Sequence, residues 1–229
     1  MKVVSVPGGF GDVSVGALSY RRYIELLLDH SAYAQVRIVM FHRMRNWVEH
    51  EPEGSPYRVL IQEIARSLVS DSIVSLGRLL NGDIRHKDKD DVSLKMLNER
   101  MRCLVAEGAL PQEPFAELTS RQLREIKECS TRKSLLWHRN KLHPHLTERY
   151  VEDPQAVHRD EPLNYGVVLA LSDRVFRMCN EHGTVASGRP EVRVNFTALY
   201  DVHLEHLLAD MTQATRSRWP DLVPAAPVE

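Results

Sequence analysis

Apolar residues recur at intervals of three and four along most of this chain, a spacing that places them on one face of an α-helix. The first long run spans residues 17–50 and stops before EPEGSP, a turn rich in proline and glycine. A second helix is expected to follow Ser55, a favourable N-cap, with Pro56 at its first position. The stripe that this helix is predicted to bury consists of Leu60, Ile64, Leu68, Leu76 and Leu79.

Four further helices are predicted from the same pattern. Ser93 is expected to cap the third, whose buried stripe is Leu94, Leu97, Met101 and Leu104. Thr119 and Gln122 have the spacing of a capping box and predict the start of the fourth, which runs to RNKLHPHL at residues 139–146. The fifth is expected to end at EHG, residues 181–183, and it carries Leu163, Val167, Leu171, Val175 and Met178. The sixth carries Phe196, Leu199, His203 and Leu207.

Helical patterns dominate the chain, which shows no repeat and no alternation of helices with strands. We therefore predict an all-α fold, a helical bundle of five to six helices, over residues 18–215. Residues 1–17 contain four glycines and one proline and are predicted to form a flexible N-terminal arm. Residues 216–229 end in VPAAPVE and are predicted to be a disordered tail.

The composition is that of an ordinary globular protein, because 43% of the 229 residues are hydrophobic and 27% are charged. The formal net charge of -1 argues against wholesale electrostatic binding to nucleic acid, so such binding needs a local patch. The three cysteines are widely spaced and form no CxxC pair, which supports neither a zinc ribbon nor a disulfide framework. Because the sequence shows no signal peptide and no membrane-spanning run, we expect a cytoplasmic protein that binds no membrane.

The densest basic segment lies at the end of the predicted fourth helix. Between residues 132 and 149, only Glu148 opposes Arg132, Lys133, His138, Arg139, Lys141, His143, His145 and Arg149. Such a segment can hold phosphates, or it can simply be a solvated helix end with histidines near the negative pole of the helix dipole. A zinc site built from three of the histidines matches no standard ligand spacing, so we expect no metal and no cofactor.

An arginine and a histidine held together over a phosphate can also cleave RNA without a metal ion. A neutral histidine takes the proton from the ribose 2′-hydroxyl, because its unperturbed pKa of about 6.5 suits both proton states. The arginine, which is always charged, stabilises the extra negative charge on phosphorus in the transition state. The products are a 2′,3′-cyclic phosphate and a free 5′-hydroxyl, and DNA is not cleaved because it lacks the attacking hydroxyl.

The stretch RNKLHPHL resembles the signature of HEPN domains, in which an arginine, often followed by a polar residue such as asparagine, precedes a histidine by four to six intervening residues. Arg139 and His145 fit this pattern with five intervening residues. The chain is more narrowly similar to the AbiU-like, abortive-infection branch, in which Arg-Asn-Lys, two aliphatic residues, Ala and His often stand at this point. DSIVSLGRLLNGD at residues 71–83 and VSLKML at residues 92–97 match that branch in the same order. The similarity covers roughly residues 20–180.

The resemblance implies a bundle that forms a homodimer, with the two motifs facing each other across a shared cleft that cleaves RNA. In that cleft Arg139 would stabilise the transition state and His145 would act as base or acid, with His143 as the second candidate. Phosphate would be held by Asn140, Lys141, Arg132 and Lys133. The implied function is a metal-independent endoribonuclease in phage defence or as a toxin, with an antitoxin protein as a candidate partner. The alternative is a catalytically inactive HEPN-like module that binds RNA, a nucleotide or a protein partner.

The sequence leaves the identity of the base open. Six helical steps place Arg139 and His145 about 120° apart on an unbroken helix, so they meet only where the chain bends. Pro144 gives a reason for such a bend, because proline cannot continue a helix comfortably. His143 lies four residues after Arg139 and would share its face if the helix continued.

A second match to the same pattern is RNWVEH, in which four residues separate Arg45 from His50. It lies at the end of the predicted first helix, whereas the motif of the resembled family lies late in the bundle. Glu49 stands within it and would repel a phosphate, so we favour the later stretch.

Overall fold

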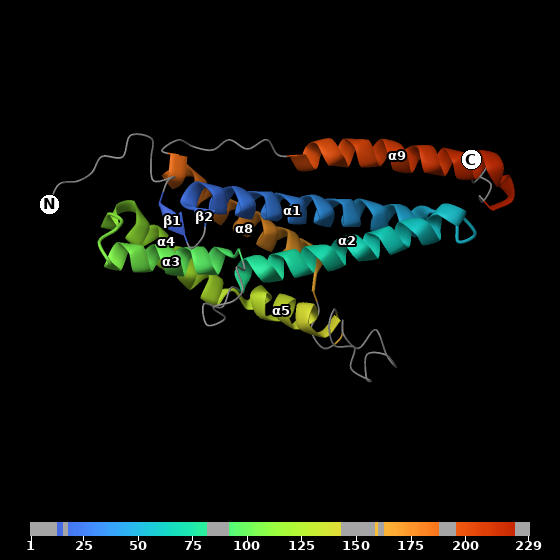
Figure 1. Cartoon of the computed structure of the whole chain (residues 1–229). Helices are drawn as coiled ribbons and strands as arrows, with labels where there is room; N and C mark the ends of the chain where they lie inside the picture. Colours follow the sequence, from blue (N-terminus) through green and yellow to red (C-terminus); the bar gives the residue numbers. More distant parts are fainter. Residues whose placement is uncertain are drawn as a thin grey trace. The chain divides into compact units, whose positions relative to one another are not determined.

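The computed structural model describes residues 13–15, 18–81, 92–142, 159, 163–187 and 196–222, and for residues 139–142, 187, 196–197 and 199 it describes the backbone alone. The elements, shown in Figure 1, are β1 (Ser14–Val15), β2 (Leu18–Ser19), α1 (Tyr20–His50), α2 (Pro56–Leu80), α3 (Leu94–Ala106), α4 (Gln112–Glu128), α5 (Ser130–Leu142), α8 (Tyr165–Ser187), α9 (Phe196–Arg218) and the 3-10 turn η1 (Pro220–Leu222). The predicted all-α class is confirmed. The described residues form seven α-helices, more than the five to six predicted, because the segment predicted as the fourth helix consists of two.

The chain divides into two compact units, and each is described by itself. Unit 1 contains residues 1–34 and 73–193, and unit 2 contains residues 35–72 and 194–229. Residues 18–215, predicted as one bundle, therefore belong partly to each unit.

The first described elements of unit 1 are two short paired strands, and α1 follows the second directly. Ser14–Val15 pairs antiparallel with Leu18–Ser19. The backbone N–H of Tyr20, the first residue of α1, donates to the carbonyl oxygen of Val13 over 2.6 Å. Residues 13–15 of the predicted arm thus lie in or beside the first strand, and the rest of the arm lies outside the described residues.

The helices of unit 1 enclose a core of large apolar side chains. α3 packs against α4, and α8 packs against both α3 and α5. The predicted cap of α3 is confirmed, because Ser93 Oγ accepts a hydrogen bond of 3.1 Å from the backbone N–H of Met96. The side chains of unit 1 that are less than 2% exposed include Tyr20, Leu27, Leu28, Leu76, Leu79, Leu80, Leu94, Leu97, Met101, Phe115 and Leu135.

The predicted start of the fourth helix is wrong, because α4 begins at Gln112, before the residues that were expected to cap it. Thr119 and Gln122 are buried in the middle of α4, and Thr119 Oγ1 donates to the carbonyl oxygen of Phe115 over 2.8 Å. The three-residue spacing of a capping box also places two side chains on one helix face, and here that face meets the core. The helix ends at Glu128, because the φ of -69° and ψ of 101° of the next residue, Cys129, are extended, and α5 starts at Ser130.

Two helices run further than predicted. α8 continues through EHG, residues 181–183, to Ser187, because glycine lowers helix stability without preventing the helix from continuing. α9 continues to Arg218 and is followed by η1, so these residues of the predicted tail are helical. Residues 223–229 lie outside the described residues.

Unit 2 contains the second part of α1, the first part of α2, and α9 with η1. Its core cluster consists of Met44, Ile61, Ala65, Leu204 and Leu208. Two positions of the stripe predicted for this part of α2 are wrong, because Leu60 and Ile64 are 54% and 37% exposed, whereas the predicted Leu68 packs against the cluster. Neighbouring positions of a helix lie about 100° apart, and both rows of α2 are apolar, so the packing partners decide which row is buried.

A buried carboxylate ties the three helical segments of unit 2 together. Glu51, directly after α1, is 4% exposed, and its Oε1 accepts hydrogen bonds from Ser55 Oγ at 2.8 Å and Thr215 Oγ1 at 2.7 Å. The Nε1–H of Trp47 donates to Thr212 Oγ1 at 2.8 Å. The hydroxyl of Ser55 therefore donates its proton to Glu51. The start of α2 directly after Ser55 is as predicted.

Replacing Thr215 with valine is expected to lower the free energy of unfolding by about 1–3 kcal/mol, because a buried charged acceptor loses a partner while the side-chain shape is nearly kept. Urea unfolding followed by circular dichroism measures this change. Ser67→Ala is the matched control, since Ser67 Oγ donates to the carbonyl oxygen of Glu63 over 3.1 Å on the exposed side of α2. We expect that control to change the free energy by less than about 0.5 kcal/mol. An equal loss in both variants would contradict the role assigned to Glu51.

Candidate functional site

The predicted motif begins in the last turn of α5. The backbones of Arg139, Asn140 and Lys141 are helical there, and their side chains are not among the described atoms. His143 and His145 lie outside the described residues, so the pairing of either histidine with Arg139 stays a prediction. The structure does describe how the helix that carries Arg139 is held.

α5 is anchored to unit 1 along one face. Leu135 is fully buried, His138 is 1% exposed, and the helix packs against α8. Lys133, in contrast, is exposed. The basic segment of the sequence is therefore divided, because His138 faces the interior while Lys133 faces solvent.

Arg132 attaches the first turn of α5 to the end of α2. Its Nε donates to the carbonyl oxygen of Leu80 over 3.1 Å, and its Nη2 donates to Asn81 Oδ1 over 3.2 Å. A cation is favourable at the C-terminal end of a helix, where the carbonyl groups carry partial negative charge. Arg132 and Arg139 are seven residues apart, so they lie on the same side of α5 within about 20°. The contacts of Arg132 thus fix the rotation of the helix that presents Arg139.

The second match, RNWVEH, lies at the end of α1 in unit 2. Arg45 Nε pairs with Glu49 Oε1 at 3.0 Å, and the Nδ1–H of His50 donates to the carbonyl oxygen of Asn46 over 2.7 Å. α1 is helical throughout this stretch, and five helical steps place Arg45 and His50 about 140° apart. These two side chains therefore do not converge on one phosphate.

A chain of hydrogen bonds between buried side chains crosses unit 1, and the sequence pattern did not predict it. Tyr20 Oη lies 2.7 Å from Nδ1 of His182, whose Nε2 lies 3.2 Å from Asn98 Oδ1. Asn98 Nδ2 donates to Gln122 Oε1 over 3.0 Å, and Gln122 Nε2 donates to Glu181 Oε2 over 2.7 Å. The first four of these side chains are fully buried. These hydrogen bonds connect α1, α3, α4 and α8.

The hydrogen-bond partners fix where the protons lie along this chain. The side-chain nitrogens of Asn98 and Gln122 each donate to a main-chain carbonyl as well, so the two amide oxygens are the acceptors. His182 therefore carries its proton on Nε2 and accepts the hydroxyl proton of Tyr20 at Nδ1. Burial lowers the pKa of His182 to about 3, with a smaller contribution from the charge of Arg121, so the ring is neutral at pH 7. Burial also raises the pKa of Tyr20.

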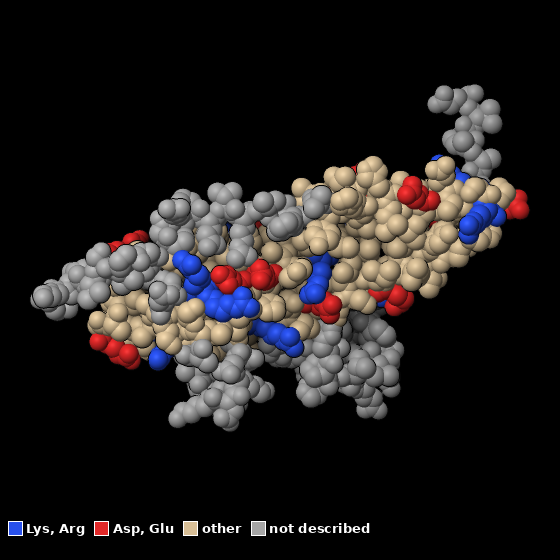
Figure 2. All heavy atoms as spheres, turned by 45° about the horizontal axis from the view of Figure 1, so that its top comes forward, with Lys and Arg blue, Asp and Glu red and all other residues tan. Residues whose placement is uncertain are grey.

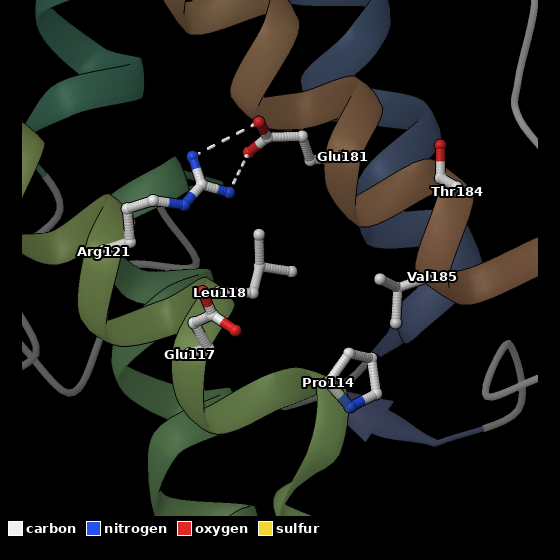
Figure 3. A pocket seen from close by; sticks show the side chains of 7 residues that line it. All are labelled: Pro114, Glu117, Leu118, Arg121, Glu181, Thr184 and Val185. Atoms are coloured by element: carbon white, nitrogen blue, oxygen red, sulfur yellow. Dashed lines mark hydrogen bonds and ion pairs between the residues drawn. The ribbon is translucent and has the colours of Figure 1, made fainter.

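The series of hydrogen bonds ends at Glu181, which lines a pocket between α4 and α8, shown in Figure 3. Arg121 Nη1 and Nη2 donate to Glu181 Oε1 and Oε2 over 3.3 and 3.0 Å. The hydrogen bond to Glu181 is the main cause that raises the pKa of Arg121. The pocket has a volume of about 340 Å³ and is lined by Pro114, Glu117, Leu118, Arg121, Glu181, Thr184 and Val185.

Basic and acidic side chains lie beside one another on the face shown in Figure 2, and much of the described surface there carries no charge. Within the described ranges, no three or more histidine, cysteine or acidic side chains are grouped so that they can hold a metal ion. None of the helices in these ranges combines the length and the apolar content needed to cross a bilayer.

The protein is thus a helical protein in which a helix anchored to the core carries Arg-Asn-Lys in its last turn, with histidines following in the sequence. A family model, HEPN AbiU2, described as AbiU2, matches residues 18–208. The chain therefore belongs to the HEPN AbiU2 family, and the predicted resemblance is confirmed. No curated protein and no solved structure matches the chain.

Proposed function

We propose that this protein is a metal-independent endoribonuclease that acts in phage defence or as a toxin. Membership of the HEPN AbiU2 family is the observation that carries the proposal. The position of Arg139 in the last turn of α5, which is anchored by Arg132 and Leu135, supports it. The proposed place of action is the cytoplasm, and an antitoxin protein is the proposed partner.

In the proposed reaction, His145 takes the proton from a ribose 2′-hydroxyl, and His143 is the second candidate for this role. The hydroxyl oxygen attacks the adjacent phosphorus, the bond to the 5′-oxygen breaks, and that oxygen takes up a proton. Arg139 stabilises the negative charge that builds on the phosphate oxygens, because a guanidinium can donate two parallel hydrogen bonds. Asn140 and Lys141 hold neighbouring phosphates.

We propose a homodimer as the active form. One chain has a net charge of -1, so a single motif offers RNA only a small positive region. A two-fold axis would place two copies of the motif together and double that local charge. The family resemblance supports such a facing arrangement.

The proposal is tested by incubating the purified protein with a single-stranded RNA, and separately with the matching DNA strand, in the presence of a chelator. We expect cleavage of the RNA alone, with 2′,3′-cyclic phosphate and 5′-hydroxyl ends. Salt-sensitive RNA binding without cleavage would instead favour a catalytically inactive binding module. The absence of both would contradict any direct action on RNA.

Arg132 is proposed to bind phosphate, and its hydrogen bonds to the end of α2 give it a positioning role as well. Arg132→Gln is expected to lower kcat about 10- to 100-fold, because a displaced α5 would misplace Arg139. Lys133→Gln removes the same charge at an exposed site and is expected to raise KM with little effect on kcat. Steady-state kinetics separate the two effects. If Arg132→Lys restored the full kcat, charge alone would explain the role of Arg132.

A further inference from the structure

We propose that the pocket between α4 and α8 binds the ammonium group of a ligand that carries a short alkyl chain. The pocket lies wholly within unit 1, and the proposal does not depend on the cleavage of RNA. Figure 3 shows that Glu117 and Arg121 come from α4, whereas Glu181, Thr184 and Val185 come from α8.

The first argument is that three of the residues that line the pocket have acceptor atoms with remaining capacity. Thr184 Oγ1 donates its single proton to the carbonyl oxygen of Asn180 over 3.1 Å, so toward a ligand it can only accept. Glu181 Oε1 receives one hydrogen bond, from Arg121, and therefore retains an acceptor site. Glu117 is exposed, and among the described residues no cation forms an ion pair with it. An ammonium has three donors and no acceptor, which complements these three groups.

The second argument is the charge of the lining. Of the lining residues, Arg121 is the single cation, and it is already engaged by Glu181 and by Glu125, which lies 3.4 Å from its Nη1. With Glu181 paired to Arg121, Glu117 is the lining carboxylate that no described cation pairs with. A phosphate or carboxylate ligand is disfavoured, because the guanidinium that would bind it is already neutralised and Glu117 would repel it.

The third argument is that the pocket is held in shape before a ligand arrives. Gln122 donates to Glu181 over 2.7 Å, and Gln122 is itself fixed by Asn98 over 3.0 Å inside the unit. A carboxylate that is already held loses less conformational freedom on binding. Leu118 and Val185 supply apolar surface for an alkyl chain, and about 340 Å³ is enough for an aliphatic diamine.

The test uses the purified full chain and 1,4-diaminobutane as the probe, and it follows the NMR chemical shifts of backbone amides in α4 and α8. We expect saturable shifts around the pocket. The peptide Ala-Lys-Ala is titrated in parallel, because preferential binding of the peptide would identify a lysine side chain of a protein, and preferential binding of the diamine a free amine. 1,4-Butanediol has the same length without charge and is expected to cause no saturable shift.

Glu117→Gln is expected to weaken binding of the preferred amine about tenfold, because one charged acceptor is lost. Glu128→Gln is the matched control, since Glu128 is an exposed carboxylate of α4 outside the pocket, and we expect it to leave the affinity unchanged. Equal weakening by the two substitutions would show that general surface charge attracts the probe and would overturn the proposal. So would equal binding of the diol, or no saturable shift with either amine.

Discussion

Replacing His145 with alanine is expected to lower the rate of RNA cleavage by about 10²- to 10⁴-fold, the usual contribution of a positioned general acid or base. The same substitution at His50 is expected to leave the rate unchanged, because the Nδ1–H of His50 donates to the carbonyl oxygen of Asn46 within α1. Initial rates on an end-labelled RNA, measured in a chelator, compare the two variants. The ends of the products show whether the residual cleavage still proceeds through the 2′-hydroxyl.

His143→Ala separates the two candidate bases. A large loss with this variant and full activity in His145→Ala would make His143 the base, which is the outcome that an unbroken helix favours. Unchanged cleavage in both variants would remove the motif at the end of α5 from the mechanism. Circular dichroism spectra and RNA affinities of the variants distinguish a loss of chemistry from a loss of folding.

The features that the sequence predicts well are those that depend on a few neighbouring residues. The cap at Ser93 and the stripe of α3 are both present in the structure, because one side chain caps the helix and the apolar positions repeat without ambiguity. The class of the fold follows in the same way from the sum of such helices. The motif at Arg139 is also local, and together with the order of the earlier stretches it was sufficient to predict the family.

The choice between two adjacent apolar rows was not predictable from local spacing. In α2, Leu60 and Ile64 repeat at helical spacing as well as Ile61 and Ala65 do, yet the second pair is buried. In α9, Leu204 and Leu208 are buried and Leu207 is exposed. The choice depends on Met44 and its neighbours in α1, which are distant in the sequence.

The polar chain through unit 1 was missed because its members are spread over four helices. Each of these polar residues, taken alone, is common in a helical protein and does not indicate a network. His182 also lies in EHG, the stretch that was predicted to end a helix. One usable signal was Asn98, which lies four residues after Leu94 and three before Met101 and so falls on the buried face of α3. A polar amide on such a face requires buried partners, because an unpaired one costs about 1–3 kcal/mol.

Lowering the pH from 7 to 5 is expected to reduce the free energy of unfolding by about 2 kcal/mol through His182 alone. In the folded protein burial holds the pKa of His182 at about 3, whereas an unfolded histidine titrates at about 6.5. Above that higher value neither state binds the proton, so no stability is lost. Between the two values the unfolded state binds a proton that the folded state excludes, and stability falls by about 1.4 kcal/mol for each pH unit.

His182→Gln tests this expectation, because glutamine does not titrate and can still accept from Tyr20 and donate to Asn98. The variant is expected to be less stable at pH 7 by about 1–3 kcal/mol. Its free energy of unfolding is expected to differ much less between pH 7 and pH 5 than that of the wild type. Urea unfolding at each pH measures both quantities, and His203→Gln, at an exposed position of α9, is the control that should keep the full change.

Between pH 7 and pH 5 the pair of Asp201 and Arg43 adds no stability change to that of His182. The pKa of Asp201 is lowered, mainly by its hydrogen bond to Arg43, so the stability that this pair adds is present above the ordinary aspartate pKa and is lost only as the pH falls well below 5. An equal loss of stability in the wild type and in His182→Gln would therefore mean that His182 takes up a proton in the folded state. In that case Nδ1 would no longer accept from Tyr20, and the direction of the whole hydrogen-bond chain would have to be reassigned.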